Sequence, residues 1–381
     1  METLNIDPTP SKTKELPPGV KKMKDLIEKG KRGELRLSFP VLQINITNKC
    51  NLNCVWCWYR EDETFSEGHL SLEDFNRFLD VNLTEDANKY DVVNLTSGGE
   101  IFMNRKIYEI MSNVKEKAPG KLIWIATNAT FTPINEKNKK CYQMVDIMNI
   151  SIDGATKETF EYIRTPAKFE KVIKNISDLV EVCKETSIEL AMTVSQINVR
   201  EVNELIELAA ELKVPSVWVG PAVITNKNLL EKLGGQNIHE MPHEEIDQIF
   251  ATAKKTAEEK NVRFNHTDLE ILKEKDAPKG KYCNCLYPWK TGPFAYDTYI
   301  IPCCLMVQEK DMRDKLKARY DFGDPKEKSA MDIYNSEAYW QFREDLLNGD
   351  ADDFCGKCIY YRFSEDVELD KDLRVEKGSI D

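Results

Sequence analysis

The chain has 381 residues, which is enough for one large domain or for two. Its 53 Lys and Arg residues against 65 Asp and Glu residues give a formal charge of −12, which disfavours non-specific binding to DNA or RNA. No apolar stretch approaches the ~20 residues that span a membrane, and residues 1–33 lack the apolar core of a signal peptide, so we expect a cytoplasmic protein.

Strands and helices alternate through most of the chain. Residues 1–40 are polar and irregular, with one short helical pattern at 20–29, and we treat them as an N-terminal extension. Apolar runs then predict strands at 41–46, 91–96, 122–127, 147–152, 188–194 and 216–219. Helices are predicted at 71–83, 105–117, 169–186, 200–212 and 244–260. Six strands that alternate with helices indicate an α/β fold of parallel βαβ units, either a barrel or an open sheet, with the ligand site at the C-terminal strand ends.

The alternation stops near residue 265, so we expect a core domain at 41–265. Beyond it, a β-hairpin is predicted at 294–302 and a helix at 336–347. We assign both to a smaller C-terminal domain at 266–364. Residues 365–381 are expected to form a solvated C-terminal tail.

Three cysteines stand together just after the first predicted strand. Cys50, Cys54 and Cys57 have the spacing C-x3-C-x2-C, and three thiols cannot all pair off as disulfides. They can converge on one inorganic centre, which suits a [4Fe–4S] cluster whose fourth iron meets a non-protein ligand. Zinc is the alternative, but structural zinc sites use four protein ligands, and no nearby His or fourth Cys completes one.

With Trp56 at the aromatic position, the motif C-x3-C-x-aromatic-C resembles the radical S-adenosylmethionine (SAM) superfamily. The resemblance implies a partial (β/α)6 TIM-like barrel with SAM chelated to the unique iron through its amino and carboxylate groups. It implies that reduced SAM yields a 5′-deoxyadenosyl radical that abstracts a substrate hydrogen. We also expect an electron donor such as flavodoxin or ferredoxin.

Other strand ends carry segments that match the same family. Gly98, Gly99 and Glu100 end the second strand, where glycines allow close backbone approach and an acid can take a cationic amino group. Ser-x-Asp-Gly follows the fourth strand, and an arginine thereafter could meet the SAM carboxylate. Each segment has an alternative interpretation. The Gly-Gly-Glu segment could be a tight turn, Asp153 and Arg164 could be an ordinary turn and a surface charge, and Val194 on the fifth strand could pack in the core. The resemblance implies that SAM is contacted by Trp56, Ser97, Gly98, Gly99, Glu100, Asn128, Ser151, Asp153, Arg164 and Val194.

The C-terminal domain holds a second group of cysteines. Four Cys that end in a CxxC pair could bind zinc or a fully ligated iron–sulfur cluster, and spacing alone does not choose. The segments 285–289, 301–304 and 331–336, with Arg343 in the following helix, resemble the SPASM/twitch extension of radical SAM enzymes. No cysteine follows the CxxC pair, which fits the shorter twitch form with one auxiliary [4Fe–4S] cluster. The implied ligands are Cys285, Cys303, Cys355 and Cys358.

Four other cysteines have weaker assignments. Cys283 and Cys304 lie next to the implied auxiliary ligands and could replace one of them. Either could also return a hydrogen atom to a substrate radical, as epimerases of the family require, although a packed thiol is the simpler interpretation. Cys141 and Cys183 are expected to be structural core thiols.

The main functional hypothesis is a radical SAM oxidoreductase or epimerase that acts on a small polar substrate, namely a sugar, an aminocyclitol or a nucleotide-linked sugar. The alternative is an enzyme that modifies a ribosomally made peptide by forming a crosslink, a thioether or a D-residue. Only 40 residues precede the first predicted strand, so an N-terminal peptide-recognition domain is expected to be absent. A third hypothesis, a zinc-binding interaction protein without catalysis, does not account for the segments at the strand ends.

Overall fold

The structure is a computed structural model of the chain. It describes residues 16–57, 68–83, 89–96, 98–223, 229, 231, 238–273, 280–292, 294–296, 299–303, 310–351, 355–356, 358, 360–368 and 373–377. Within these residues no helix is long and apolar enough to cross a membrane.

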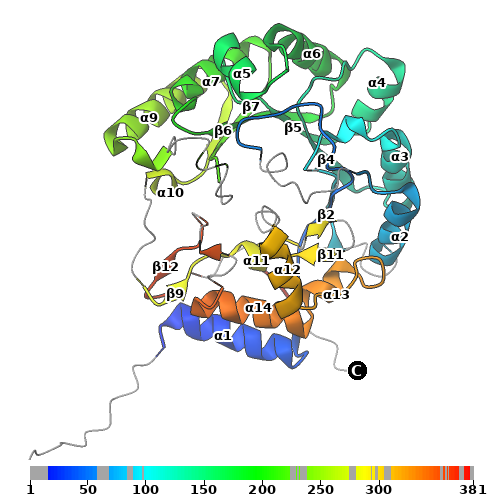
Figure 1. Cartoon of the computed structure of the whole chain (residues 1–381), viewed down its shortest axis with the longest axis vertical. Coiled ribbons are helices and arrows are strands. Elements are labelled where there is room, and N and C mark those ends of the chain that lie inside the picture. Colours follow the sequence, from blue (N-terminus) through cyan, green and yellow to red (C-terminus); the bar gives the residue numbers. More distant parts are fainter. Residues whose placement is uncertain are drawn as a thin grey trace, which may run out of the picture.

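A nine-stranded sheet forms the centre of the molecule, and seven of its strands run parallel in the order β2-β3-β4-β5-β6-β7-β8. These strands are β2 Val41–Ile44, β3 Val92–Asn94, β4 Leu122–Thr127, β5 Ile147–Ser151, β6 Ser187–Val194, β7 Ser216–Pro221 and β8 Arg263–His266. The sheet curves into a partial TIM barrel (Figure 1). The hairpin of β10 Phe294–Tyr296 and β11 Tyr299–Ile301 extends it, because β10 pairs in parallel with β2.

The α/β fold and the six predicted strands are confirmed, but the barrel contains a seventh parallel strand that the sequence did not predict. This strand, β8, reads Arg-Phe-Asn-His and is largely exposed. Apolar alternation therefore gives no signal there, and only its pairing with β7 defines it as a strand.

Helices cover the outer, convex face of the sheet (Figure 1). They are α2 Leu72–Leu83, α3 Ile107–Lys117, α4 Glu136–Tyr142, α5 Lys157–Ile163, α6 Phe169–Val182, α7 Val202–Glu211 and α9 His243–Lys260. The same region contains α10 Leu269–Lys273 and the 3-10 turns η3 Ile101–Met103, η4 Val199–Glu201 and η5 Ile238–Glu240. Strand side chains alternate between the two faces. On β5, Met148 and Ile150 are fully buried in the core, whereas Asn149 and Ser151 are half-buried on the concave face.

The C-terminal region closes one side of the open barrel (Figure 1). Its helices are α11 Tyr287–Lys290, α12 Lys310–Arg319, α13 Ala330–Tyr334 and α14 Glu337–Asn348, and its short strands β9 Tyr282–Cys283 and β12 Phe363–Ser364 pair antiparallel. The first helix, α1 Pro18–Lys31, packs along α14. A Cβ atom on Gly30 would lie 2.2 Å from the Trp340 ring, so glycine sets how closely the two helices approach.

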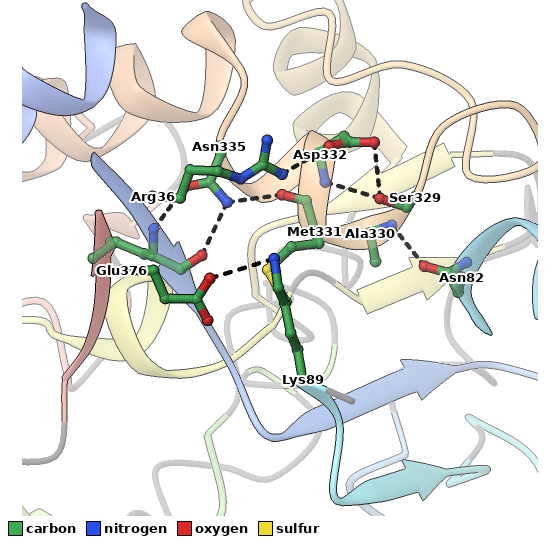
Figure 2. Close-up of polar contacts among 10 residues, drawn as sticks. Arg36, Asn82, Lys89, Ser329, Ala330, Met331, Asp332, Asn335 and Glu376 are labelled. Carbon is green, nitrogen blue, oxygen red and sulfur yellow. Dashed lines mark hydrogen bonds and ion pairs between the residues drawn. The ribbon is translucent and has the colours of Figure 1, made fainter. Parts of the chain in front are cut away.

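The two ends of the chain join the barrel to the C-terminal region. Strand β1 Leu35–Ser38 pairs antiparallel with β13 Arg374–Lys377, so the expectation of a solvated tail is wrong for these last residues. Asn335, labelled in Figure 2, exchanges hydrogen bonds with the backbone of Leu37: its Oδ1 accepts from the amide at 2.7 Å and its Nδ2 donates to the carbonyl at 2.9 Å. The ion pair of Lys89 with Glu376 lies beside this contact. The tail prediction failed because these pairings join residues far apart in sequence.

Candidate active site

The cysteine loop follows β2 at the C-terminal edge of the parallel strands. Its backbone is fixed against the end of α5, since the Asn53 amide donates to the Thr165 carbonyl at 2.6 Å and the Val55 amide donates to the Ile163 carbonyl at 3.0 Å. Within the loop the Cys57 amide donates to the Cys54 carbonyl at 3.0 Å. These contacts hold the motif in a compact turn.

Cys50, Cys54 and Cys57 are half-buried, so a bound iron centre could reach all three side chains. The described residues contain no three His, Cys, Asp or Glu side chains already arranged around one metal position, so the three ligands stay a prediction. Trp56 is half-buried on the same loop.

A glycine lets the loop after β3 lie directly against the cysteine loop. The Gly99 amide donates to the Thr47 carbonyl at 3.1 Å, and the Glu100 amide donates to the Lys49 carbonyl at 2.8 Å. A Cβ atom at position 99 would stand 2.1 Å from the Lys49 oxygen, which backbone cannot accommodate without moving. Gly98 donates to Asn45 Oδ1 at 3.2 Å, while Ser97 lies outside the described residues. The Gly-Gly segment therefore serves the close approach of two backbones.

The carboxylate of Glu100 lies beneath this contact and is 2% exposed. It accepts hydrogen bonds from Thr127 Oγ1 at 2.8 Å, from the Asn128 amide at 2.7 Å and from the Phe102 amide at 3.3 Å. Burial raises the pKa of Glu100, and these hydrogen bonds oppose that rise. An acid that is oriented by donors and poorly solvated is suited to receive a cationic group.

Asn128 connects the end of β4 to the cysteine loop. Its Nδ2 donates to Asn51 Oδ1 at 3.0 Å and lies 3.9 Å from the Cys50 sulfur. Amide donors to sulfur are one way in which a protein tunes an iron–sulfur cluster. The next residue, Ala129, has a φ of 52°, a left-handed backbone conformation that glycine adopts more readily than alanine.

Asp153 and Arg164 meet behind the cysteine loop. Arg164 Nη2 lies 2.6 Å from Asp153 Oδ2, and the Thr193 amide donates to Asp153 Oδ1 at 2.8 Å. Both residues are buried, and Arg164 Nε has no hydrogen-bond partner among the described residues. The pair differs from the ordinary turn and surface charge that formed the alternative interpretation, because it places a buried cation close to the thiols. Burial raises the pKa of Cys54 to about 12, and the charge of Arg164 opposes that rise.

Ser151 and Val194 end their strands in different environments. Ser151 is half-buried on the concave face, where a ligand can reach it. Val194 is 1% exposed and packs in the hydrophobic core, so it offers a ligand little surface.

Two supporting residues escaped the sequence analysis. Asn198 is fully buried, and its Nδ2 donates to the carbonyls of Asp153 at 2.9 Å and Thr193 at 2.8 Å. Glu201 accepts from the amides of Ala155 and Thr156, which fixes the turn after Asp153. Both lie in the loop after β6, and only their place in the folded chain reveals their role.

The C-terminal cysteines also gather. Cys283, Cys285, Cys355 and Cys358 contribute to one packed cluster with Leu346, Ala351, Tyr361 and Phe363. Burial and then the neighbouring thiols Cys283 and Cys358 raise the pKa of Cys285 to about 12. Cys303 is half-buried at the main core, and Cys304 lies outside the described residues. Cys283 is thus a closer competitor for an auxiliary ligand position than its sequence context indicated.

Arg343 of α14 contacts several segments of the C-terminal region. It is fully buried, and its guanidinium lies over the rings of Tyr334, Tyr339 and Trp340 at 4.1, 4.4 and 4.4 Å from their centroids. It donates to the Pro288 carbonyl at 3.2 Å and to the Tyr334 carbonyl at 2.8 Å. Since Pro288 stands three residues after Cys285, Arg343 helps to hold that cysteine's segment in place.

Two family models match the regions just described. Residues 44–209 match the model described as the radical SAM superfamily, and residues 283–359 match the SPASM model, described as an iron–sulfur cluster-binding domain. The chain belongs to the radical SAM superfamily. More specifically, it is a radical SAM enzyme with a C-terminal SPASM iron–sulfur cluster-binding domain, and its cofactors are a [4Fe–4S] cluster, SAM and auxiliary iron–sulfur bound by that domain. The close Gly99 contact, the Asn128 amide near Cys50 and the buried Arg164 fit these groups.

Curated relatives match mainly the core. Fe-coproporphyrin III synthase of Methanosarcina barkeri is 27% identical over 181 residues, which is 47% of this chain and 43% of the relative. AdoMet-dependent heme synthase of the same organism is 30% identical over 44% of this chain and 46% of its own length. The chain thus spans less than half the length of these two relatives. A probable GTP 3′,8-cyclase of Methanocaldococcus jannaschii is 22% identical over 69% of this chain and 84% of the relative.

Solved structures share the fold of nearly the whole chain. SuiB of Streptococcus suis bound to S-adenosylmethionine superposes with a TM-score of 0.62 at 15% identity, covering 92% of this chain and 81% of that one. The enzyme anSMEcpe with bound AdoMet and the Cp18Cys peptide has a TM-score of 0.57 at 16% identity, covering 83% of this chain and 88% of that one. These similarities support the barrel and the C-terminal region together.

Proposed function

We propose that the chain is a radical SAM enzyme that modifies a peptide on the concave face of its barrel. The observation that carries this proposal is the fold similarity of barrel and C-terminal region together to SuiB, which has been solved with the precursor peptide SuiA, and to anSMEcpe with its peptide. The sequence-based preference for a sugar, an aminocyclitol or a nucleotide-linked sugar is less well supported than the peptide alternative.

The residues at the strand ends are proposed to hold SAM and its cluster. Cys50, Cys54 and Cys57 would ligate three irons, and the bound cluster and SAM would supply the hydrogen-abstracting chemistry of the family. Glu100 would accept the SAM ammonium, because its carboxylate is already oriented by three donors. Arg164, held by Asp153, would contribute a fixed positive charge beside this centre.

The auxiliary site is proposed to bind one [4Fe–4S] cluster through Cys285, Cys303, Cys355 and Cys358. A cluster with four protein ligands leaves no open iron, so it would carry electrons rather than bind the peptide. Cys283 is 2% exposed and accepts a hydrogen bond from the Cys285 amide at 3.4 Å, which favours ligation or packing over hydrogen donation to a substrate.

The test is turnover under anaerobic conditions with reconstituted enzyme, SAM, a reductant such as flavodoxin or dithionite, and a library of short peptides. Peptide-dependent formation of 5′-deoxyadenosine together with a mass change in the peptide is the expected result. The same assay with GTP and with nucleotide-linked sugars is the comparison. Modification of one of these small molecules, with no peptide modified, would overturn the proposal.

A further inference from the structure

A hydrogen-bonded row of side chains crosses the concave face of the barrel from β4 to β8. Trp124 Nε1 donates to Asn149 Oδ1 at 2.7 Å, and Asn149 Nδ2 donates to Glu189 Oε1 at 3.0 Å. From the other side, Ser216 Oγ and Asn265 Nδ2 donate to Glu189 Oε2 at 2.7 and 3.3 Å. Donors from β5, β7 and β8 thus converge on one carboxylate of β6, and Asn149 extends the row to Trp124 on β4.

Glu189 carries the charge of this row. Its side chain is half-buried, and all the groups that donate to it are neutral amides or hydroxyls. Among the described residues, no Lys, Arg or His lies within ion-pair distance of it. Neutral donors orient a carboxylate without cancelling its charge, so Glu189 presents a fixed negative charge to the interior of the barrel.

An aromatic ring stands beside this charge, one step closer to the C-terminal strand ends. In the sheet register Ser216 lies opposite Glu189, whereas Trp218 lies opposite Ala191. The Trp218 side chain is 36% exposed, although its strand, β7, is paired on both sides with β6 and β8. Its ring lies over Gly220, where a Cβ atom would come within 2.1 Å of it.

A residue with a small side chain, Ala191, lies opposite Trp218 in the sheet register. Ala191 pairs in register with Ser151 on β5 and with Trp218 on β7, and all three side chains are on the concave face. Ser151 is one of the residues proposed to contact SAM. Trp218 therefore shares a row of the sheet with Ser151, one step closer than Glu189 to the strand ends at which SAM is proposed to bind.

We propose that Glu189 and Trp218 form a recognition site for a cationic side chain of the substrate, the ammonium of lysine or the guanidinium of arginine. This inference rests on the proposed peptide function. A partly desolvated carboxylate attracts such a cation, and an indole face adds a cation–π contact to it. The site would place a lysine or arginine of the peptide next to the reacting centre.

The test measures binding and needs no turnover, so its failure is distinguishable from failure of the proposed function. Nα-acetyl-lysine methylamide is titrated into the reconstituted full chain with SAM, and binding is followed by saturation-transfer NMR. Nα-acetyl-norleucine methylamide, which lacks the charge, is the reference ligand. The lysine derivative is expected to bind saturably in the millimolar range and about tenfold more tightly than the norleucine derivative.

Two variants test whether the preference for the lysine derivative depends on Glu189 and Trp218. Glu189→Gln should weaken binding of the lysine derivative about tenfold and leave the norleucine derivative unchanged. Trp218→Leu should weaken both. Glu207→Gln, which removes the same charge from an exposed position on α7, should change neither, and thermal unfolding of all variants confirms that they fold. Equal binding of the two ligands, full retention of lysine binding by Glu189→Gln, or absence of saturable lysine binding would each overturn the inference, even if peptides are modified.

Discussion

Arg164 and Asp153 form an ion pair inside the protein, with 2.6 Å between Arg164 Nη2 and Asp153 Oδ2 and side chains that are 10% and 1% exposed. Burial raises the pKa of Asp153, and the attraction of Arg164 opposes that rise. The pair sits where the loop after β5 meets the cysteine loop, since residues on both sides of Arg164 accept hydrogen bonds from Asn53 and Val55. It therefore links the stability of the barrel to the geometry of the site.

Removing one partner of this ion pair should lower the free energy of unfolding more than removing both partners. Arg164→Met leaves the Asp153 carboxylate buried and unpaired, and we expect a loss of about 3–5 kcal/mol in the free energy of unfolding. The double variant Arg164→Met with Asp153→Asn should recover part of that loss. Urea denaturation under anaerobic conditions measures the free energy of unfolding of the single and the double variant. Lys168→Met, at an exposed position, is the control. A single variant that is as stable as the wild type would contradict a paired state.

Glu100 predicts a pH dependence of stability. Burial raises the folded-state pKa of Glu100 above the ordinary value of 4.5, so this residue holds a proton more tightly in the folded chain than in the unfolded one. Its favourable contribution is complete below the unfolded-state pKa and is lost as the pH rises through the raised folded-state value. Glu100→Gln should therefore gain stability relative to the wild type as the pH rises above 4.5. Unfolding of both proteins between about pH 5 and pH 8 measures this, and an unchanged difference would show that the pKa is not raised.

The sequence can place residues at strand ends where they follow an apolar run closely. Asn128 and Asp153 stand just past β4 and β5, Glu100 follows β3 after a short loop, and the carboxyl ends of parallel strands meet at one edge of a sheet. The structure does bring Glu100 and Asn128 together, at 2.7 Å. A local pattern is enough when the fold itself places the ends of the strands side by side.

Contacts between distant segments have no such local signal. Asn198 supports Asp153 across 45 residues of sequence, and Glu189 belongs to a strand whose alternation shows only that one face is polar. Leu37 and Asn335 meet across 298 residues, and nothing near either position indicates a partner. The packing of the whole chain decides which segments come into contact. The sequence alone therefore does not reveal the roles of Asn198, Glu189 and Asn335.

Gly99→Ala should disrupt the cofactor site through backbone displacement. The added Cβ atom would lie 2.1 Å from the Lys49 carbonyl oxygen, so one of the two loops must move. We expect stability to fall by about 1–3 kcal/mol and SAM affinity to fall at least tenfold. Equilibrium dialysis with labelled SAM and thermal unfolding measure the two effects.

Gly68→Ala is the control for this substitution, because a Cβ atom there meets nothing within 4 Å. Its SAM affinity and thermal unfolding should match those of the wild type. If Gly99→Ala also binds SAM normally, the close approach of the two loops does not shape the site.

The two groups of cysteines should bind iron independently. The wild type is expected to hold about eight iron atoms per chain after anaerobic reconstitution, and the triple substitution of Cys50, Cys54 and Cys57 by Ala should leave about four. SAM cleavage should disappear in that variant while the absorbance near 400 nm falls by roughly half. Iron analysis by mass spectrometry together with visible spectra tests this.

Single substitutions then identify the contested auxiliary ligand. Cys283→Ser and Cys303→Ser are compared, because Cys283 packs with the other auxiliary cysteines whereas Cys303 belongs to the main core. Because the proposed ligand set contains Cys303 and not Cys283, we expect Cys303→Ser to lose auxiliary iron and Cys283→Ser to retain it. The opposite result would exchange their assignments. Loss of all iron in the first triple variant would show that the two cysteine groups do not act separately.

Arg343 provides a test of what holds the C-terminal domain together. Its guanidinium donates to the carbonyls of Pro288 and Tyr334 and is surrounded by aromatic rings. Arg343→Met fills a similar volume but leaves both carbonyls without their donor, and we expect a loss of about 2–4 kcal/mol in the free energy of unfolding. Arg343→Lys keeps the charge over the rings, yet one ammonium cannot reproduce the planar fork, so it should lose about half as much.

The Arg343 variants should also affect the metal content of the C-terminal domain, because Pro288 lies three residues from Cys285. Arg343→Met should therefore lose auxiliary iron more readily on exposure to a chelator, while the iron bound by Cys50, Cys54 and Cys57 is retained. Lys315→Met, at an exposed position on α12, is the control for loss of a positive charge. If Arg343→Met unfolds at the same urea concentration as the wild type, aromatic packing alone stabilises this core and the buried cation is dispensable.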